Sequence, residues 1–589
     1  MGLTKWILKN PRVDFENMSR TLGVSELICR VLVNRKIYEQ IDAMAFINPE
    51  LSKLYNPRLM KDLVKAADII KDKITSGKKI RIVGDYDVDG VISTYVLMEA
   101  LTHCGALVDY DIPHRVHDGY GINVSIIEKA YKDGIDTIIT CDNGIAAIDQ
   151  IKHAKQLGMT VIVTDHHEVP FVVCEDGSRC HVIPEADAVV DCKQTDCNYP
   201  FKLLCGAGVV FKLAQVLFEE FHISKAIEEQ LYEMVAIATV CDVVDLVSEN
   251  RIIVKKGLET LANTKNPGLL ALLMETGIQD KELSVYHLGF IIGPCINASG
   301  RLECARQGLE MLLCRNIDDA IPLARELAQL NAERKSMTQE GIEEVCAAIE
   351  SSDIKNDKVF IVYNNNIHES IAGIIAGKIR EKYNVPTFVL TDSENGVKGS
   401  GRSIEEYNMF EELLACRDLL DKFGGHPMAA GLSLPYENIE LLRRAMNEKA
   451  TLTEDDLVPK LYIDAQVPIE TISLLMAQEI SILEPYGKGN SKPVFADKNV
   501  AVTRATVIGA NKNVLKLKLS KKTGKSIDAI YFGNIEDFDS YIEAKFGENE
   551  KNLMYEGKNN NVVLDLAFNI DINQYNNLKS VQLILQNFR

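Results

Sequence analysis

The segment 80–90, IRIVGDYDVDG, places aspartates at alternate positions directly after a short β-branched run. The run 79–84 predicts a buried parallel strand that leads into a helix. An EF-hand calcium loop is disfavoured because it needs a preceding helix and a glutamate at its twelfth position, where this chain has Val96. A solvated acidic turn remains the alternative for the motif alone. The aspartates Asp85, Asp87 and Asp89 therefore indicate a metal site at a strand-to-helix junction.

The next part of the chain alternates short apolar runs with segments of helix length. Runs of the first kind are 106–112, 136–141, 160–164 and 188–190, and segments of the second kind are 124–132 and 146–156. Near-continuous apolar strands separated by helices are typical of a parallel sheet covered on both faces. We therefore predict an α/β fold in which the strand carboxyl ends share one edge.

Carboxylates and imidazoles follow these predicted strands. Asp142 lies in TCDNG, Asp165, His166 and His167 lie in VTDHHEVP, and Asp242 lies in CDVVDL after the helical run 231–240. Ligands of open parallel sheets gather outside the strand carboxyl ends. Carboxylates and neutral imidazoles bind Mn²⁺ or Mg²⁺, and several carboxylates can bridge two such ions for phosphoester hydrolysis. The pattern thus predicts a centre with two divalent ions.

Taken in order, GDYDVDG, TCDNG, VTDHHEVP and CDVVDL resemble the four metal motifs of the DHH phosphoesterase family. The segments 31–62, 111–123 and 198–213 are similar to the branch of that family that degrades single-stranded DNA from 5′ to 3′. The resemblance implies the metal ligands Asp85, Asp87, Asp89, Asp142, His166 and Asp242. All of these except Asp85, together with His167, are expected to be catalytic. Other branches place a histidine ligand at the position of Asp85.

The second half begins with a helical pattern at 323–349, which we interpret as a connector, and a new α/β unit begins at Lys358. Its motifs IHESIAGIIAGKI, KGSGRS and GGHPMAAG resemble the second DHH subdomain, which holds substrate phosphates through glycine backbone and basic side chains. The implied substrate-binding residues are Arg115, Asn297, Arg301, Ser400, Arg402, Ser403 and His426. Two positions depart from the family, because Cys295 replaces a common Arg and Val514 a frequent His.

After the acidic stretch TEDDLVPK, short alternating runs with Gly and Asn punctuation indicate a small β-barrel, and the resemblance implies an OB-fold. The predicted fold class is a two-lobed DHH phosphoesterase core with a parallel sheet, a long connector helix, a second α/β subdomain and an OB-like barrel. The predicted domains are an N-terminal helical segment at 1–70, a catalytic domain at 71–315, a connector at 316–352, a substrate-binding subdomain at 353–454 and a nucleic-acid-binding domain at 455–589.

Composition limits the location and the partners of the chain. It has neither a signal-peptide core nor an apolar run of membrane-spanning length, so we expect a cytoplasmic protein with reduced thiols and no membrane partner. Its cysteine spacings match no CxxC zinc pair. The net charge of −19 disfavours broad adhesion to DNA but allows a local basic groove.

The expected function is a Mn²⁺- or Mg²⁺-dependent exonuclease that degrades single-stranded DNA from 5′ to 3′ to mononucleotides, in DNA repair and recombination. By the same resemblance, a helicase and a single-strand-binding protein are expected partners. Two alternatives remain: a phosphodiesterase acting on short oligonucleotides or cyclic dinucleotides, and a non-catalytic single-strand-binding scaffold. The extra C-terminal unit disfavours the first, and the intact metal motifs disfavour the second.

Overall fold

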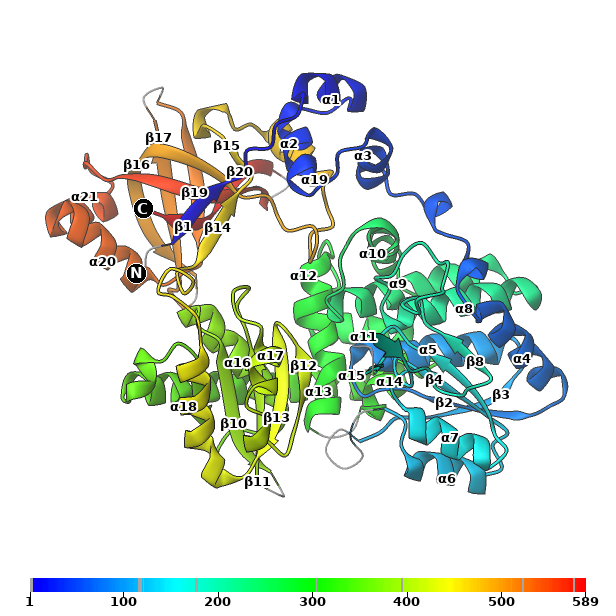
Figure 1. The fold of residues 1–589 in the computed structure, drawn as a ribbon. Coiled ribbons are helices and arrows are strands. Elements are labelled where there is room, and N and C mark those ends of the chain that lie inside the picture. Colours follow the sequence, from blue (N-terminus) through cyan, green and yellow to red (C-terminus); the bar gives the residue numbers. More distant parts are fainter. Residues whose placement is uncertain are drawn as a thin grey trace. The chain divides into compact units, whose positions relative to one another are not determined.

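The computed structural model describes residues 4–589 except 115–118, 120, 175–177, 303–304, 394–395, 510, 522–523 and 576–577. It contains two compact units, Glu50–Leu457 and a second that joins Met1–Pro49 to Val458–Arg589. The larger unit has two lobes (Figure 1). Within the described residues, no helix combines the length and apolar character needed to cross a membrane.

The first lobe contains a five-stranded parallel sheet, as the sequence predicted. Its strand order is β3-β2-β4-β5-β8. The strands are β2 (Lys79–Val83), β3 (Leu107–Asp111), β4 (Thr137–Cys141), β5 (Thr160–Thr164) and β8 (Ala188–Val190). The next two strands along the chain, β3 and β4, pair with opposite edges of β2, so the chain reverses its winding direction there. The strand ends on either side of this point border the crevice in which ligands of such sheets bind.

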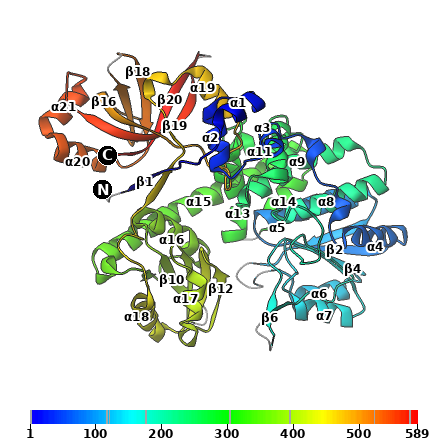
Figure 2. The same ribbon diagram turned by 45° about the horizontal axis from the view of Figure 1, so that its top comes forward.

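Helices cover both faces of this sheet. Successive strand residues point to opposite faces, so Ile80 and Ile82 belong to one apolar cluster and Val83 and Ile138 to the other. The first cluster contains α4 (Leu63–Thr75), α5 (Val88–His103), α8 (Gly206–Glu220) and α9 (Lys225–Cys241). The second contains α6 (Val124–Lys132) and α7 (Ile148–Gln156), which lie side by side in both views (Figure 1, Figure 2).

Further helices complete the first lobe and lead to the second. They are α10 (Ser248–Leu261), α11 (Pro267–Glu275), α12 (Val285–His287), the π-helix η3 (Leu288–Ile292), α13 (Gly293–Leu302) and α14 (Arg306–Leu313). The predicted connector is the long helix α15 (Ile317–Glu350). Ala320 and Leu327 of α15 pack into the first lobe, and Val345 and Ile349 pack into the second. One helix therefore joins the cores of both lobes.

The second lobe is a five-stranded mixed sheet of order β12-β13-β11-β10-β9. Its strands are β9 (Phe360–Tyr363), β10 (Thr387–Ser393), β11 (Gly396–Arg402), β12 (Lys422–His426) and β13 (Ala429–Leu434). The helix α16 (Glu369–Tyr383) packs with α15 in one apolar cluster, and α17 (Met409–Leu414) packs with α18 (Ile439–Lys449) in another. Residues 398–402 of KGSGRS lie on the central strand β11, so their backbone is held by the strands paired on both sides.

The smaller unit contains the predicted barrel, a six-stranded sheet of order β15-β16-β17-β18-β20-β19 that closes through β16 and β19. The strands are β15 (Ala465–Gln466), β16 (Phe495–Ile508), β17 (Val514–Ser520), β18 (Ser526–Tyr531), β19 (Val563–Tyr575) and β20 (Leu578–Phe588). Its helices are α19 (Leu474–Ser481), α20 (Ile535–Phe546) and α21 (Glu548–Glu556). Closure removes the exposed edges that an open sheet would present.

The N-terminal segment completes the smaller unit. Its strand β1 (Lys5–Leu8) pairs in parallel with β14 (Lys460–Ile463). The N-terminal helices are α1 (Phe15–Leu22), α2 (Glu26–Asn34) and α3 (Gln40–Ile47). Ile28 and Leu32 of α2 are fully buried in the same apolar cluster as Phe495 and Leu517 of the barrel. Residues close to the N-terminus thus share a core with residues far along the chain.

The expectation of reduced thiols is wrong at one position. Cys174 and Cys180 form a disulfide at the hairpin of β6 (Phe171–Val173) and β7 (Arg179–His181). Antiparallel pairing brings their Cα atoms to 6.2 Å, within reach of a disulfide.

A buried ion pair fixes α8 within the first lobe. Lys212 Nζ lies 2.6 Å from Glu249 Oε1, and both side chains are fully buried. Glu249 also accepts hydrogen bonds from the Tyr55 N–H at 2.8 Å and the Tyr199 hydroxyl at 2.5 Å. A buried carboxylate with several donors is stable only while all of them remain. The network therefore ties α8 to α10 and to the segment before α4.

We expect Lys212→Met to lower the free energy of unfolding by about 3–5 kcal/mol, because it leaves Glu249 charged and buried without its cation. Urea unfolding measures the loss. The control is Lys212→Met combined with Glu249→Gln, which removes both charges and keeps an acceptor for the tyrosines. The double variant should be more stable than the single variant; equal stability would show that the ion pair does not hold α8.

Candidate metal centre and substrate cavity

Asp85, Asp87 and Asp89 occupy the turn between β2 and the first turn of α5. Asp87 is the N-cap of α5, and its side chain accepts the Gly90 N–H at 3.1 Å. Asp85 and Asp89 are 1% and 2% exposed. The capping geometry thus turns the chain sharply after the strand and buries two carboxylates beside each other.

The N-terminus of α8 holds Asp89. The N–H groups of Gly206 and Ala207 donate to the two carboxylate oxygens at 2.6 and 2.8 Å. The first N–H groups of a helix lack partners within the helix and carry partial positive charge, so they stabilise a buried anion. A Cβ atom at Gly206 would lie 2.7 Å from the Asp142 Cβ and 3.0 Å from Asp89 Oδ2. The close approach therefore requires glycine.

His166 lies at the centre of the predicted ligands. Its Nε2 is 3.0 Å from Asp142 Oδ1 and 3.6 Å from Asp89 Oδ2, and its Nδ1 is 3.8 Å from Asp242 Oδ2. Asp142 follows β4 with a positive φ of 60°, and Asp242 is the C-cap residue of α9. Four separate chain segments therefore meet at one edge of the sheet, as the motif positions predicted.

The donor atoms form three overlapping groups, in each of which they lie within 4.8 Å of one another. The groups are Asp85 with Asp87 and Asp142, Asp89 with His166 and Asp242, and Asp142 with His166 and His167. Shared members indicate adjacent metal positions. Asp85 Oδ2 is buried and has no hydrogen-bond partner among the described residues, which is costly without a cation. The donor set thus fits oxygen- and imidazole-preferring divalent ions.

Asp165 orients His167, a role that the sequence did not assign to it. Asp165 Oδ1 lies 2.7 Å from His167 Nδ1 and accepts the His166 N–H at 2.7 Å, while Oδ2 accepts the Ile145 N–H at 2.8 Å. Burial lowers the pKa of His167, but the hydrogen bond and nearby carboxylates outweigh it and raise the pKa to about 9. In the sequence, the only sign of this role was the position of Asp165 directly after the apolar run 160–164.

Burial and mutual repulsion dominate the electrostatics of the ligands. Burial, followed by repulsion from neighbouring aspartates, raises the pKa values of Asp85, Asp89, Asp142 and Asp242. Burial lowers the pKa of His166, so its imidazole is neutral and able to bind a metal. Without metal, several of these carboxylates therefore hold protons well above the ordinary carboxyl range.

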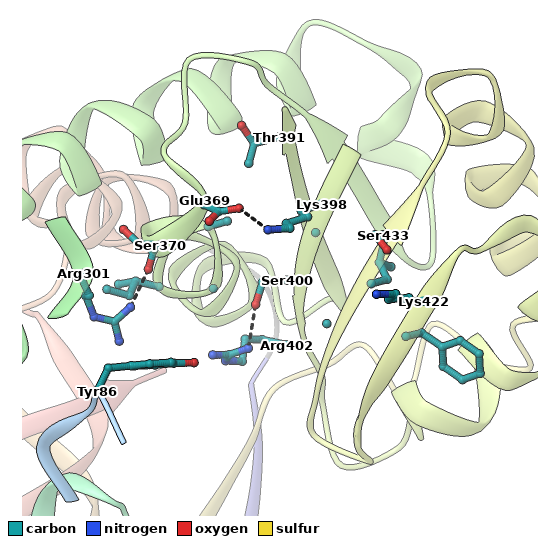
Figure 3. Close-up of a pocket in the computed structure, with 17 residues that line it drawn as sticks. Tyr86, Arg301, Glu369, Ser370, Thr391, Lys398, Ser400, Arg402, Lys422 and Ser433 are labelled. Carbon is teal, nitrogen blue, oxygen red and sulfur yellow. Dashed lines mark hydrogen bonds and ion pairs between the residues drawn. The ribbon is translucent and has the colours of Figure 1, made fainter. Parts of the chain in front are cut away.

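A polar cavity of about 500 Å³ combines residues of both lobes (Figure 3). Tyr86 and Arg301 come from the first lobe, and Lys398, Arg402 and Lys422 come from the second. Lysines and arginines with hydroxyl groups nearby are suited to phosphate groups. The cavity therefore has the chemistry of an anion site.

Three of the predicted substrate residues line this cavity. Arg301 Nη1 donates to the Ser370 carbonyl at 2.6 Å, and Arg402 Nη1 donates to Ser400 Oγ at 3.3 Å. A Cβ atom at Gly373 would lie 2.7 Å from Ser400 Oγ and 3.0 Å from Arg402 Nη2. A glycine in α16 thus makes room for the Ser400–Arg402 pair, which the sequence pattern could not show.

The other predicted substrate residues are placed differently. Ser403 is buried and donates to the Tyr407 carbonyl at 2.6 Å, and the exposed His426 accepts the Met428 N–H at 3.2 Å. Asn297 lies on α13 with a buried Oδ1 that has no hydrogen-bond partner in the described part of the chain. These three do not line the cavity just described, and Arg115 lies outside the described residues.

The two residues that depart from the family pattern lie at packed or half-buried positions. Cys295 is buried, and its Sγ accepts a hydrogen bond from Asn331 Nδ2 of α15 at 3.3 Å. Its side chain therefore fills the contact between α13 and α15. Val514 begins β17 of the barrel and is half-buried.

Three family models match consecutive parts of the chain. The N-terminal domain of the DHH family matches residues 79–239, the DHHA1 domain matches 356–451, and the RecJ OB domain matches 463–587. These matches fall on the first lobe, the second lobe and the barrel.

Relatives match nearly the whole chain. The single-stranded-DNA-specific exonuclease RecJ of Bacillus subtilis is 35% identical over 99% of this chain and 70% of its own length. RecJ of Escherichia coli is 31% identical over 94% of this chain and 98% of its own. Among solved structures, RecJ of Thermus thermophilus in complex with Mn²⁺ has a TM-score of 0.80 at 24% identity, covering 99% of this chain and 79% of its own.

We expect Gly206→Ala to reduce activity and Mn²⁺ affinity at least about tenfold, because the methyl group would displace Asp89 and Asp142. Isothermal titration with Mn²⁺ and a nuclease assay measure the two effects. The matched control is Gly208→Ala on the same helix, whose Cβ would meet Leu204 at 3.2 Å instead of a carboxylate. Equal losses in both variants would contradict a specific role of Gly206.

Metal binding should release protons and tighten as pH rises. The raised carboxyl pKa values mean that Mn²⁺ must displace protons, and this displacement costs less at higher pH. We expect the apparent Mn²⁺ affinity to increase from about pH 6 to about pH 8. Calorimetry in two buffers of different ionisation enthalpy counts the released protons. Affinity independent of pH, with no proton release, would contradict the prediction.

Proposed function

The chain belongs to the RecJ family of single-stranded-DNA-specific exonucleases within the DHH phosphoesterases, and from this premise we propose how its residues hydrolyse DNA. It is a metal-dependent hydrolase that acts on single-stranded DNA with Mn²⁺ or Mg²⁺. We propose that it removes nucleotides from 5′ to 3′ and releases mononucleotides, in DNA repair and recombination.

The metal donors divide between two adjacent ions. Asp85, Asp87 and Asp142 would hold one ion, and Asp89, His166 and Asp242 would hold the other. When bound, the ions supply Lewis acids for the scissile phosphate and an activated water. Asp142 and His166 lie 3.0 Å apart, so they define where the two donor groups meet. The α8 N-terminus favours the ionised form of Asp89, against the burial that raises its pKa, and holds the carboxylate in place.

His167 acts on the phosphate in this proposal. Asp165 fixes its ring through Nδ1, and this hydrogen bond raises the pKa of His167 against the effect of burial. A cationic imidazole can donate a hydrogen bond through Nε2 to a phosphate oxygen or to the leaving oxygen, where negative charge increases during the reaction. His167 is 45% exposed in its side chain, which leaves it accessible to substrate.

Arg301 and Arg402 supply positive charge for the DNA phosphates, together with Lys398, whose Nζ lies 3.0 Å from Glu369 Oε2. They line the same cavity although the whole chain has a net charge of −19. Arg402 is mostly buried, and burial lowers the pKa of its guanidinium because it removes water from the charged group. An anion bound in the cavity would offset this desolvation free energy. Local charge therefore binds the substrate while the acidic surface disfavours duplex adhesion.

The observation that carries the proposal is the combination of an intact two-ion donor set with this cationic cavity in one compact unit. The barrel adds a second surface that could bind single-stranded DNA by stacking and charge. We further propose that the enzyme acts in the cytoplasm on strands exposed by a helicase and covered by a single-strand-binding protein.

The test follows single-stranded DNA labelled at one end, with free and with blocked 5′ termini, in the presence of Mn²⁺. Wild type should release 5′ mononucleotides from the free end only, and Asp142→Ala should reduce the rate of digestion at least about 1000-fold because a ligand of one ion is removed. Arg402→Lys should mainly raise KM, since it keeps charge but not two-pronged contact. Digestion of blocked ends would overturn the polarity, and cleavage of dinucleotides alone would favour a small-substrate phosphodiesterase.

A further inference from the structure

Two large aromatic side chains are unusually exposed on the first lobe. Tyr286 of α12 is 61% exposed, and Phe290 of the π-helix η3 is 65% exposed. Their rings stack on each other with centroids 5.2 Å apart and an interplanar angle of 21°. Tyr131 and Phe532 are similarly exposed, and the stacking of Tyr286 on Phe290 is what marks this pair as a candidate contact surface.

The pair lies on a helical run that leads to the substrate cavity. Residues 285–302 continue through α12, η3 and α13 without a break. Along α13, the described positions that are not buried are Pro294, Asn297 and Arg301. Positions 286, 290, 294, 297 and 301 are spaced by three or four residues, which places them on one face of a helix. We define Tyr286, Phe290, Pro294, Asn297 and Arg301 as the accessible stripe.

A different face of the run is occupied by packing. A Cβ atom at Gly293 would lie 2.2 Å from Cys241 Sγ, and one at Gly289 would lie 3.3 Å from a methyl carbon of Val240. These glycines let the run lie against the end of α9, where Asp242 provides a metal donor. The packing fixes the direction of the accessible stripe relative to the metal centre.

Both ends of the accessible stripe have the chemistry of a nucleic-acid contact. Arg301 lines the cationic cavity at one end, and Phe290 lies about 16 Å away along the helix at about 1.5 Å per residue. Between them, Pro294 and Asn297 are half-buried on the same face. Cations beside aromatic platforms are the combination that binds single strands without reading their sequence.

We infer that Tyr286 and Phe290 form a base-stacking platform for single-stranded DNA a few nucleotides from the phosphates held in the cavity. The inference rests on the proposed function, and it names the substrate segment that this surface holds. Binding to this pair would not depend on base identity, because every base offers a ring face for stacking. The platform would keep the strand on the enzyme between successive cleavages without taking part in the chemistry.

The experiment combines Tyr286→Ala and Phe290→Ala and compares a long oligonucleotide with a dinucleotide that is too short to reach the platform. The double variant should raise KM for the long substrate about fivefold or more, because stacking on an aromatic side chain contributes that much per base. The value of kcat and the rate on the dinucleotide should remain unchanged. Tyr286→Phe should retain wild-type KM, since it keeps the ring.

The matched control is Tyr131→Ala on α6, which removes a tyrosine that is 53% exposed outside the accessible stripe. A second measurement uses wild type alone, with abasic sites placed at successive positions of the oligonucleotide. Affinity should fall when the missing base is the one that meets the platform, and the double variant should lack this dependence. This scan tests the inference even if the double variant does not fold.

The outcomes separate the two proposals. If wild type degrades long single strands but neither the double variant nor any abasic site changes KM, the platform is overturned and the exonuclease stands. If wild type degrades no single-stranded DNA, the proposed function fails and the platform fails with it. A KM increase that Tyr131→Ala reproduces would also overturn the platform.

Discussion

Asp89 accepts hydrogen bonds from the first two N–H groups of α8, and the catalytic lobe is arranged around this contact. A carboxylate at this depth is expensive unless donors compensate it. The helix supplies them because Gly206 allows its backbone to reach both Asp89 and Asp142. The ion pair between Lys212 and Glu249 fixes the same helix further along, so the position of one ligand depends on packing throughout the lobe.

The free-energy cost of burying carboxylates also applies to the other metal donors, which lie at the edge of the sheet. The donors Asp85, Asp142 and His166 follow parallel strands whose ends converge, and each brings an oxygen or nitrogen atom to a small volume. Like charges at this distance raise one another's pKa values, which makes a cation the favourable partner. The site is therefore poorly suited to remain without metal and well suited to two divalent ions.

The second lobe adds positive charge where the first lobe has mainly negative charge. Arg301 donates to the Ser370 carbonyl at the start of α16, and Ser400 and Arg402 lie beside Gly373 of that helix. The long helix α15 belongs to the cores of both lobes, so it fixes the separation between the acidic centre and the cationic cavity. Residues of both lobes, among them Arg301 and Arg402, thus supply the positive charge of this cavity.

The sequence by itself determined the parallel sheet and the barrel, because these depend on local periodicity, and it placed the candidate metal donors mainly at strand ends. Tertiary structure alone decided which backbone groups support them. Gly206 acts through a contact with Asp89, which is distant in sequence, and Asp165 acts through the direction of its side chain toward His167. Neither contact leaves a periodic signal in the sequence. The same holds for the packing of α2 with the barrel and for the cavity beside Arg402, which long-range packing creates.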